Sequence, residues 1–310
     1  MTEDYPRTLM EMERRFSSDE ACRQYLFERR WPEGFVCPRC GGKKAWQMGR
    51  GLWLCGSCRL QVSVTSGTVF QDSHLSLTTW FRAMWHITSQ KNGVSALGLQ
   101  RVLGLGSYKT AWAVLHKLRR AMVRPGRDRL RGTVEVDETY WGGQEEGVTG
   151  RLTEDKALIV VAAEEDGKGI GRIRLRRIPD LTRASLHGFI TEFVEPGSTV
   201  RTDGLNAYRE LAGYVHDRQV QRHQPEGEYL MPRVHRVVSL LKRWLLGTHQ
   251  GTIGREQLDY YLDEFTFRFN CRKSASRGKL FFRLARQAVH VEPAPFASLT
   301  KTKSQPLVVG

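Results

Sequence analysis

Residues 132–143 read GTVEVDETYWGG and predict a β-strand with two acidic side chains on one face. Two valines alternate with Glu135 and Asp137, as the side chains of a strand do. We expect the strand to stop at Glu138-Thr139, before the paired glycines. Buried carboxylates are costly unless something positive meets them, so a divalent metal ion is one interpretation. The alternative is a half-exposed edge strand whose acids are solvated.

The composition indicates a large folded protein with a polyanionic partner. The chain has 310 residues, of which 40% are hydrophobic, so two or three domains with a real core are expected. Lys and Arg number 48 against 33 Asp and Glu, which gives a formal charge of +15. Such an excess usually means a nucleic-acid partner. Basic character that serves solubility alone is the alternative.

The sequence predicts neither a membrane segment nor a secretion signal. No apolar run reaches the ~18 residues of a membrane span, and the N-terminal residues lack the apolar core of a signal peptide. Six cysteines, four of them in paired spacing, fit metal binding in a reducing compartment better than disulfides. We therefore expect a cytoplasmic protein.

Residues 33–72 are predicted to form a zinc ribbon, after a helical segment over residues 1–32. Two Cys-x-x-Cys pairs with fourteen residues between them can bring four thiolates to one tetrahedral zinc ion: Cys37, Cys40, Cys55 and Cys58. Four sulfur ligands leave no open position, so the zinc is expected to be structural. The surrounding cations suggest DNA contacts, among them Arg39, Lys43 and Lys44. The alternative is a small folding staple with solvated charges.

Residues 73–124 show the apolar spacing of three short helices with a basic outer face. A turn at residues 104–107 separates the second helix from the third, which ends in a basic cluster. This order predicts a helix-turn-helix DNA-binding domain, although any small three-helix core gives the same spacing. The residues expected to face DNA are Ser107, Lys109, Thr110 and Lys117.

Residues 130–287 alternate between strand and helix patterns and predict an α/β domain on a mixed sheet. The order is three strands, helix, strand, short helix, strand and then helices, and it resembles the RNase H-like fold. In that fold the first and fourth strands are neighbours, so Asp137 and Asp203 at their ends would meet where ligands collect. Taken alone, Asp203 fits a helix N-cap equally well. Residues 288–310 are predicted to form a flexible tail.

Several segments resemble an insertion-sequence transposase of the DDE type, in the group that carries an N-terminal zinc ribbon. The resemblance extends from the ribbon to about Arg272 and includes VEVDET (134–139), RTDG (201–204), SLLKR (239–243), GTH (247–249), YLDEF (261–265) and RFN (268–270). It implies that Asp137 and Asp203 are the first two acids of the catalytic triad. Carboxylates there would hold one or two Mg²⁺ or Mn²⁺ ions, which clamp the attacking and leaving oxygens of a phosphoryl transfer.

The sequence departs from the family at the third acid. The family often has Glu seven residues before a lysine on the same helix, and the residue seven before Lys242 is His235. These two side chains share a helix face, so we predict an Asp-Asp-His-Lys arrangement. A neutral imidazole can ligate a divalent ion, Mn²⁺ better than Mg²⁺, or it can donate to a phosphate or orient a water. Lys242, with Arg243 beside it, would contact the DNA backbone.

Other roles are open for these positions. His235 could be a helix N-terminal residue with no metal, and Lys242 could be a solvated charge. The substitutes for the third acid are Glu226, Glu228 and Glu264. The departure also permits a decayed copy that binds DNA without cutting it.

The sequence therefore predicts a DNA transposase that binds the terminal inverted repeats of an insertion sequence and catalyses metal-dependent strand cleavage and strand transfer. Its partners would be the element ends and target DNA. The resemblance further implies a homo-oligomer on DNA, in a cytoplasmic, nucleoid-associated protein. The alternatives are a catalytically inactive zinc-ribbon DNA-binding regulator and a nuclease that cuts without joining.

Overall fold

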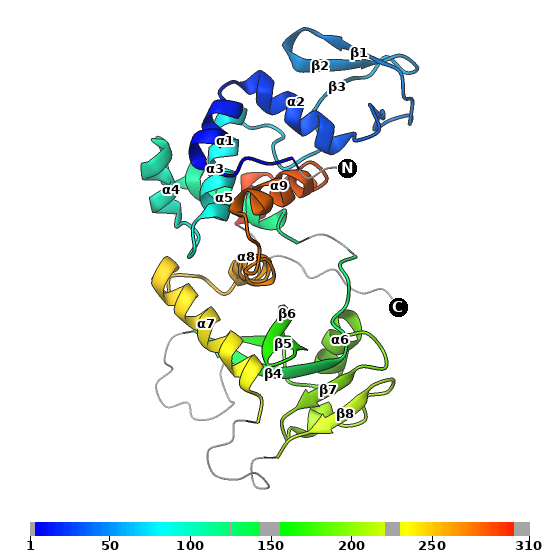
Figure 1. Cartoon of the computed structure of the whole chain (residues 1–310), viewed down its shortest axis with the longest axis vertical. Helices are drawn as coiled ribbons and strands as arrows, with labels where there is room; N and C mark the ends of the chain where they lie inside the picture. The colour runs from blue at the N-terminus through cyan, green and yellow to red at the C-terminus, as the bar shows by residue number, and fades with distance from the viewer. Residues whose placement is uncertain (1–3, 124–125, 143–155, 221–229, 301–310) are drawn as a thin grey trace. The chain divides into compact units, whose positions relative to one another are not determined.

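The computed structural model describes residues 4–123, 126–142, 156–220 and 230–300, and this part of the chain forms two compact units (Figure 1). Residues 4–123 group with residues 273–300, and the described residues between 126 and 272 form the second unit. The predicted catalytic range, 130–287, crosses this division, because the chain after Arg272 belongs to the first unit. Among the described residues, no helix has both the length and the apolar character needed to cross a membrane.

The first unit combines a small antiparallel sheet with seven helices of the described chain. The sheet has the order β1-β2-β3, formed by Ala45–Met48, Leu52–Cys55 and Gln61–Ser63, with a 3-10 turn at Gly49–Gly51. The helices are α1 (Leu9–Arg15), α2 (Asp19–Arg30), α3 (Leu77–Ser89), α4 (Ala96–Leu103), α5 (Tyr108–Arg120), α9 (Arg277–Ala288) and α10 (Phe296–Leu299). Helix α10 lies within the range predicted as a tail, and residues 301–310 of that range lie outside the described part.

Serine hydroxyls start several of these helices. The side chains of Ser18, Ser76, Ser95 and Ser107 accept hydrogen bonds from N–H groups in the first turns of α2, α3, α4 and α5. Helix α4 ends at Gly104, whose φ of 62° is the left-handed conformation that closes a helix. The turn predicted at residues 104–107 is therefore present between α4 and α5.

Helix α9 completes the core of the first unit. Phe281 is fully buried, with ring centroids 5.7 Å from Phe16 and 5.6 Å from Phe81. One turn earlier, a Cβ on Gly278 would lie 1.7 Å from the backbone oxygen of Pro6, so only glycine fits there. The C-terminal helix thus packs closely against the N-terminal segment of the same unit.

The second unit is built on a five-stranded mixed sheet with the order β6-β5-β4-β7-β8. The pairs β4–β5 and β5–β6 are antiparallel, whereas β7 is parallel to both β4 and β8. The strands are β4 (Thr133–Trp141), β5 (Ala157–Asp166), β6 (Gly169–Ile178), β7 (Thr199–Thr202) and β8 (Val215–Arg218). The prediction of an α/β protein with a mixed sheet is confirmed.

Strand β4 is longer than predicted. We expected it to stop at Glu138-Thr139, but it continues to Trp141, which lies opposite Ala157 of β5. The prediction of the strand end was wrong because the pairing with β5 continues beyond the acids.

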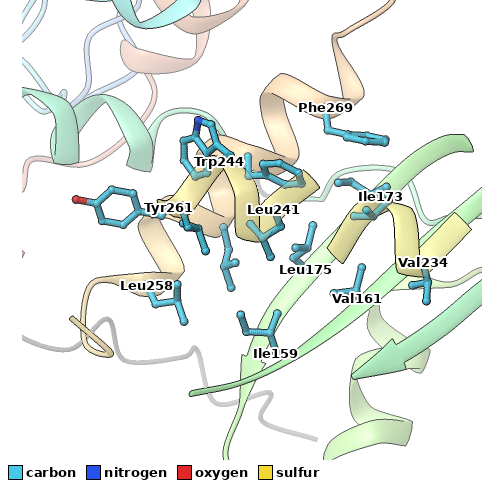
Figure 2. Close-up of a cluster of buried hydrophobic side chains, with 14 of the residues drawn as sticks. Ile159, Val161, Ile173, Leu175, Val234, Leu241, Trp244, Leu258, Tyr261 and Phe269 are labelled. Atoms are coloured by element: carbon cyan, nitrogen blue, oxygen red, sulfur yellow. The ribbon is translucent and has the colours of Figure 1, made fainter. Parts of the chain in front are cut away.

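Helices cover both faces of this sheet (Figure 1). Helices α7 (Pro232–His249) and α8 (Leu258–Asn270) cover one face, and α6 (Arg183–Phe193) with the 3-10 turn Asn206–Tyr208 covers the other. Figure 2 shows Leu241 of α7 among buried side chains of β5 and β6, including Val161 and Leu175. This apolar core holds α7 on one face of the sheet. Glu135 and Asp137 of β4 point to the same face, because they alternate with Val134 and Val136, which are buried in the core on the opposite face.

Candidate metal centres

One candidate metal centre is formed by the four cysteines of the ribbon. Their sulfur atoms all lie within 4.8 Å of one another. The Sγ atoms of Cys37 and Cys58 are 3.6 Å apart, as are those of Cys40 and Cys55. Sulfurs held tetrahedrally at ~2.3 Å from a zinc ion would lie about 3.8 Å apart. The arrangement therefore fits a structural zinc ion.

Each cysteine pair lies on a tight turn of the backbone. The N–H of Gly41 donates to the oxygen of Cys37, and the N–H of Arg59 donates to the oxygen of Cys55. Gly41 and Arg59 occupy equivalent places and both have positive φ, 71° and 59°. The backbone N–H of Cys58 lowers the pKa of Cys55 to about 6, which favours the thiolate that binds zinc.

A second candidate metal centre lies at the end of β7. One carboxylate oxygen each from Asp137, Glu138 and Asp203 can be chosen so that all three lie within 4.8 Å of one another. The strand register explains this, because Glu135 of β4 pairs with Arg201 of β7 in a parallel ladder. Continuing that register by two residues sets Asp137 beside Asp203. The structure thus brings together the two aspartates that the sequence singled out.

The turn after β7 holds Asp203 in place. Its Oδ1 accepts a hydrogen bond from the N–H of Leu205 at 2.9 Å. Nη2 of Arg218 donates to the oxygen of Gly204 at 2.6 Å and fixes the same turn. Asp203 therefore shapes its own loop but is not an N-cap, because the following 3-10 turn has Leu205 at its N-cap and no side-chain cap, and it still offers an oxygen to the carboxylate cluster.

Glu138 is a member of the cluster that we predicted only as the end of the strand and not as a ligand. The Oη of Tyr208 donates to Oε2 of Glu138 at 3.1 Å. Tyr208 is fully buried, and burial raises the pKa of its hydroxyl well above the usual range, so it stays a donor. The available signal was a second acid directly after Asp137 near the end of a strand.

The electrostatics of the cluster favour a bound cation. Burial raises the pKa of Asp137, and the neighbouring carboxylate of Asp203 adds to the rise. The N–H of Glu138 donates to Oδ1 of Asp137 at 2.9 Å, and this hydrogen bond lowers the pKa of Asp137. Carboxylate oxygens are the ligands preferred by Mg²⁺ and Mn²⁺, so the donor set fits a hard divalent ion.

His235 lies at the edge of this cluster, on α7. Its Nε2 is 3.2 Å from Oδ2 of Asp137, and its side chain is 48% exposed. Lys242 follows on the same helix face, about 10 Å further along at a rise of ~1.5 Å per residue. Lys242 is partly exposed and Arg243 is exposed, so this face of α7 carries positive charge away from the acids.

The substitutes for the third acid divide into two groups. Glu226 and Glu228 lie outside the described residues. Glu264 is fully buried in α8, with Oε1 3.5 Å from Nε of Arg268. A buried ion pair within one helix is a structural role. Glu138 and His235 are therefore the groups that the described structure places beside the two aspartates.

The other residues predicted to face DNA lie on the ribbon and on α5 with its N-cap. The ribbon residues Arg39, Lys43 and Lys44 are exposed, as is Lys109, and Thr110 is partly exposed. Ser107 accepts a hydrogen bond from the N–H of Lys109 at 3.2 Å and so caps α5. Burial lowers the pKa of Lys117. Among these residues, Lys109 and the three ribbon cations are the most accessible to a ligand.

Comparison with known proteins finds family matches for two segments of the chain. Residues 129–270 match an ISXO2-like transposase domain, and residues 17–61 match a transposase zinc-ribbon domain. A protein from Halobacterium salinarum, described as an uncharacterized protein in transposable element ISH50, is 28% identical over 278 residues, which cover 82% of this chain and 91% of that protein. The carboxylate cluster lies in the first matched range, and the four cysteines lie in the second. The chain therefore combines a transposase zinc-ribbon domain with an ISXO2-like transposase domain.

Proposed function

We propose that this chain is a DNA transposase that binds the terminal inverted repeats of an insertion sequence and catalyses metal-dependent strand cleavage and strand transfer. The observation that carries the proposal is the meeting of Asp137, Glu138 and Asp203 within reach of one ion. This cluster lies inside the range that matches the transposase domain. The family supplies the substrate class, and the carboxylates supply a site for phosphoryl transfer.

In this proposal Asp137 and Asp203 hold a divalent ion, with His235 or Glu138 as the third group. Mg²⁺ or Mn²⁺ bound there would neutralise phosphate charge and stabilise the attacking and leaving oxygens. His235, 3.2 Å from Asp137, can add an imidazole nitrogen, which suits Mn²⁺ better than Mg²⁺. Alternatively, it donates a hydrogen bond to a phosphate from the exposed side of the cluster.

We assign the positive face of α7 to the DNA backbone. Lys242 and Arg243 lie about two turns beyond His235, so they can contact phosphates of a strand whose scissile bond lies at the carboxylates. Such contacts orient the strand without reading its sequence. Holding the scissile phosphate in place is the main contribution that the protein makes to an in-line displacement.

The proposal includes two fold assignments. The sheet order, with three antiparallel strands followed by two parallel ones and helices on both faces, supports an RNase H-like catalytic domain. Helices α4 and α5, joined at residues 104–107, support a helix-turn-helix over residues 73–124. In that domain Lys109 and Thr110, at the start of the second helix, would face the DNA. The ribbon would add contacts through Arg39, Lys43 and Lys44.

The proposed partners are the element ends and target DNA. Joining of two ends to one target requires them to be held together, so a homo-oligomer on DNA is part of the proposal. Its place would be the nucleoid, in the cytoplasm.

A strand-transfer assay with a labelled fragment of the element's end tests this function. Wild type is compared with Asp203→Asn during a titration with Mg²⁺ or Mn²⁺. Asp217→Asn on β8, whose carboxylate pairs with Arg201 and is not part of the cluster, is the matched control. We expect cleavage and joining with wild type and control, and end binding without either reaction with Asp203→Asn.

The same assay separates the rival functions. Free ends without joined products would identify a nuclease. Salt-sensitive binding by the wild type without cleavage at any divalent concentration would identify a regulator. Either result, or strand transfer by Asp203→Asn, would contradict the proposal.

A further inference from the structure

Glu135 is a buried acid that the proposed chemistry does not use. It lies on β4 two residues before Asp137, on the same face of the strand, and is 0% exposed. A carboxylate in such a place is costly unless its oxygens are satisfied by hydrogen bonds. The partners of Glu135 therefore indicate its role.

Both oxygens of Glu135 accept hydrogen bonds from the first turn of α7. Oε2 accepts from the N–H groups of Arg233 at 2.8 Å and Val234 at 2.9 Å, and Oε1 accepts from Nη1 of Arg233 at 3.0 Å. The residue before the helix, Met231, offers no side-chain cap. Glu135 thus caps α7 from a distant strand, where the helix dipole also favours a negative charge.

Arg233 fixes the same turn in a second direction. Its Nη2 donates to Glu165 and to the oxygen of Gly167, and its Nε donates to the oxygen of Gly169 at 3.1 Å. These acceptors lie at the end of β5, the turn after it and the start of β6. The start of α7 is therefore held on β4 by Glu135 and on the β5–β6 turn by Arg233.

This attachment sets the place of His235. Val234 points into the core shown in Figure 2, and the next residue puts its Nε2 3.2 Å from Oδ2 of Asp137. Glu135 and Asp137 are about 7 Å apart along the strand, at ~3.4 Å per residue. The start of α7 covers the same length of strand, so that Arg233 contacts Glu135 and His235 contacts Asp137. A shift of the helix start would move His235 away from the cluster.

We propose that Glu135 is a positioning residue that fixes α7 on β4 so that His235 stays beside Asp137 and takes part in binding the divalent ion. The inference rests on the proposed function for the role of the ion. The contact between His235 and Asp137 is present without the ion and can be tested by itself. Glu135 touches neither DNA nor metal in this arrangement and acts only through the helix.

The experiment follows the ring signal of His235 by NMR in the full-length, zinc-loaded chain labelled with ¹⁵N-histidine. His235→Gln assigns the signal. In the absence of added divalent ion, the chemical-shift change that Asp137→Asn causes in this signal reports the contact between His235 and Asp137. With Mn²⁺, its paramagnetic broadening reports how close the ring lies to the ion. Glu135→Gln is the test variant, and Glu192→Gln, which loses a charged pairing with Arg176 and no contact with α7, is the matched control.

Wild type and Glu192→Gln are expected to show both effects. In the Glu135→Gln background, Asp137→Asn should no longer shift the His235 signal, because the helix start has lost its charged acceptor. Broadening should require about 10- to 100-fold more Mn²⁺, as when other residues that orient a metal ligand are changed. Thermal unfolding checks that the variant is folded.

An unchanged shift and unchanged Mn²⁺ dependence in folded Glu135→Gln would overturn the inference. If that variant does not fold, Glu135→Leu combined with Arg233→Met replaces the buried pair by apolar side chains. The same losses are expected there, and retention of the contact would again count against Glu135. Failure of the wild type to bind Mn²⁺ would contradict the proposed function, whereas the metal-free shift would still decide the role of Glu135.

Discussion

Nε2 of His235 lies 3.2 Å from Oδ2 of Asp137, so helix α7 meets β4 at the residue most central to the carboxylate cluster. Asp137 thus lies close to both the imidazole of His235 and the carboxylate of Asp203. Several measurable properties depend on how the charge of this residue is balanced.

Asp137→Asn should stabilise the protein at neutral pH when no divalent ion is present. Burial raises the pKa of Asp137 above 3.8, so the folded state favours its protonated form. That stabilisation is complete below the unfolded value and is lost as the pH rises through the raised folded value. At pH 7 the ionised carboxylate therefore opposes folding, and Asn removes this effect. Thermal unfolding should show a higher Tm for the variant at pH 7 and a smaller difference toward pH 4.

When Mg²⁺ or Mn²⁺ is added, the wild type should have the higher Tm, because only the wild type gains stability from the bound ion. Asp217→Asn, which loses a pairing with Arg201, should not raise the Tm in either condition. A lower Tm for metal-free Asp137→Asn at pH 7 would contradict this account.

Leu241→Ala should reduce the free energy of unfolding of the second unit by about 2–5 kcal/mol. Leu241 is fully buried in the core between α7 and the sheet, and its removal leaves a cavity (Figure 2). Leu246 on the same helix is 58% exposed, so Leu246→Ala should change stability by only about 0.5 kcal/mol. Urea unfolding of the two variants makes the comparison, and equal effects would mean that α7 is not held by this core.

Tyr208→Phe should weaken divalent binding while leaving the sheet core packed. The change removes the donor that orients Oε2 of Glu138, and we expect an effect of about tenfold or more on Mn²⁺ affinity. Tyr214→Phe, which loses a hydrogen bond to the oxygen of Val194 in the same unit, is the control and should leave the affinity unchanged. Calorimetric titration measures both. Equal affinities would remove Glu138 from the set of ligands.

Removal of zinc should unfold the ribbon. Four thiols within 4.8 Å of one another, in a sheet of three short strands, depend on the metal for most of their stability. Structural zinc sites supply roughly 10–16 kcal/mol of apparent binding free energy. A chelator, or Cys55→Ser, should abolish the zinc content and change the fluorescence of Trp53, which stacks on Phe27 at a ring distance of 4.3 Å. Zinc added back should restore the fluorescence of the wild type alone.

Lys109→Gln should weaken binding to the element end and lower the slope of log affinity against log salt by about one. Lys109 is exposed at the start of α5, where a phosphate contact is proposed. Lys168→Gln, in the exposed turn after β5, should leave the slope unchanged. Fluorescence anisotropy at several salt concentrations measures both slopes. An unaltered slope for Lys109→Gln would argue against DNA contact at this helix.

Local signals were sufficient for some elements of this structure. The spacing of Cys37, Cys40, Cys55 and Cys58 predicts the ribbon, because two short turns can bring four sulfurs together without help from the rest of the chain. The turn at residues 104–107 was equally readable, since Gly104 and Ser107 end one helix and begin the next.

Other features depend on contacts between distant segments. The end of β4 at Trp141 is set by pairing with β5, and the meeting of Asp137 with Asp203 is set by the register of β4 and β7. The resemblance to a known family suggested that meeting, whereas the spacing of the two residues did not. The sequence around Glu135 gave no sign of its role. Glu135 accepts hydrogen bonds from the N–H groups of Arg233 and Val234, which lie 98 and 99 positions later in the chain.

The packing of α9 affects when the first unit can mature during synthesis. Phe281 fills the core around Phe16 and Phe81, and Gly278 lies against Pro6, so these N-terminal residues lack their final partner until the ribosome has passed the whole second unit. A polypeptide that terminates early, before Arg277, would leave this apolar surface uncovered. Such a shortened product is therefore expected to aggregate or to be degraded rather than to accumulate as a folded first unit.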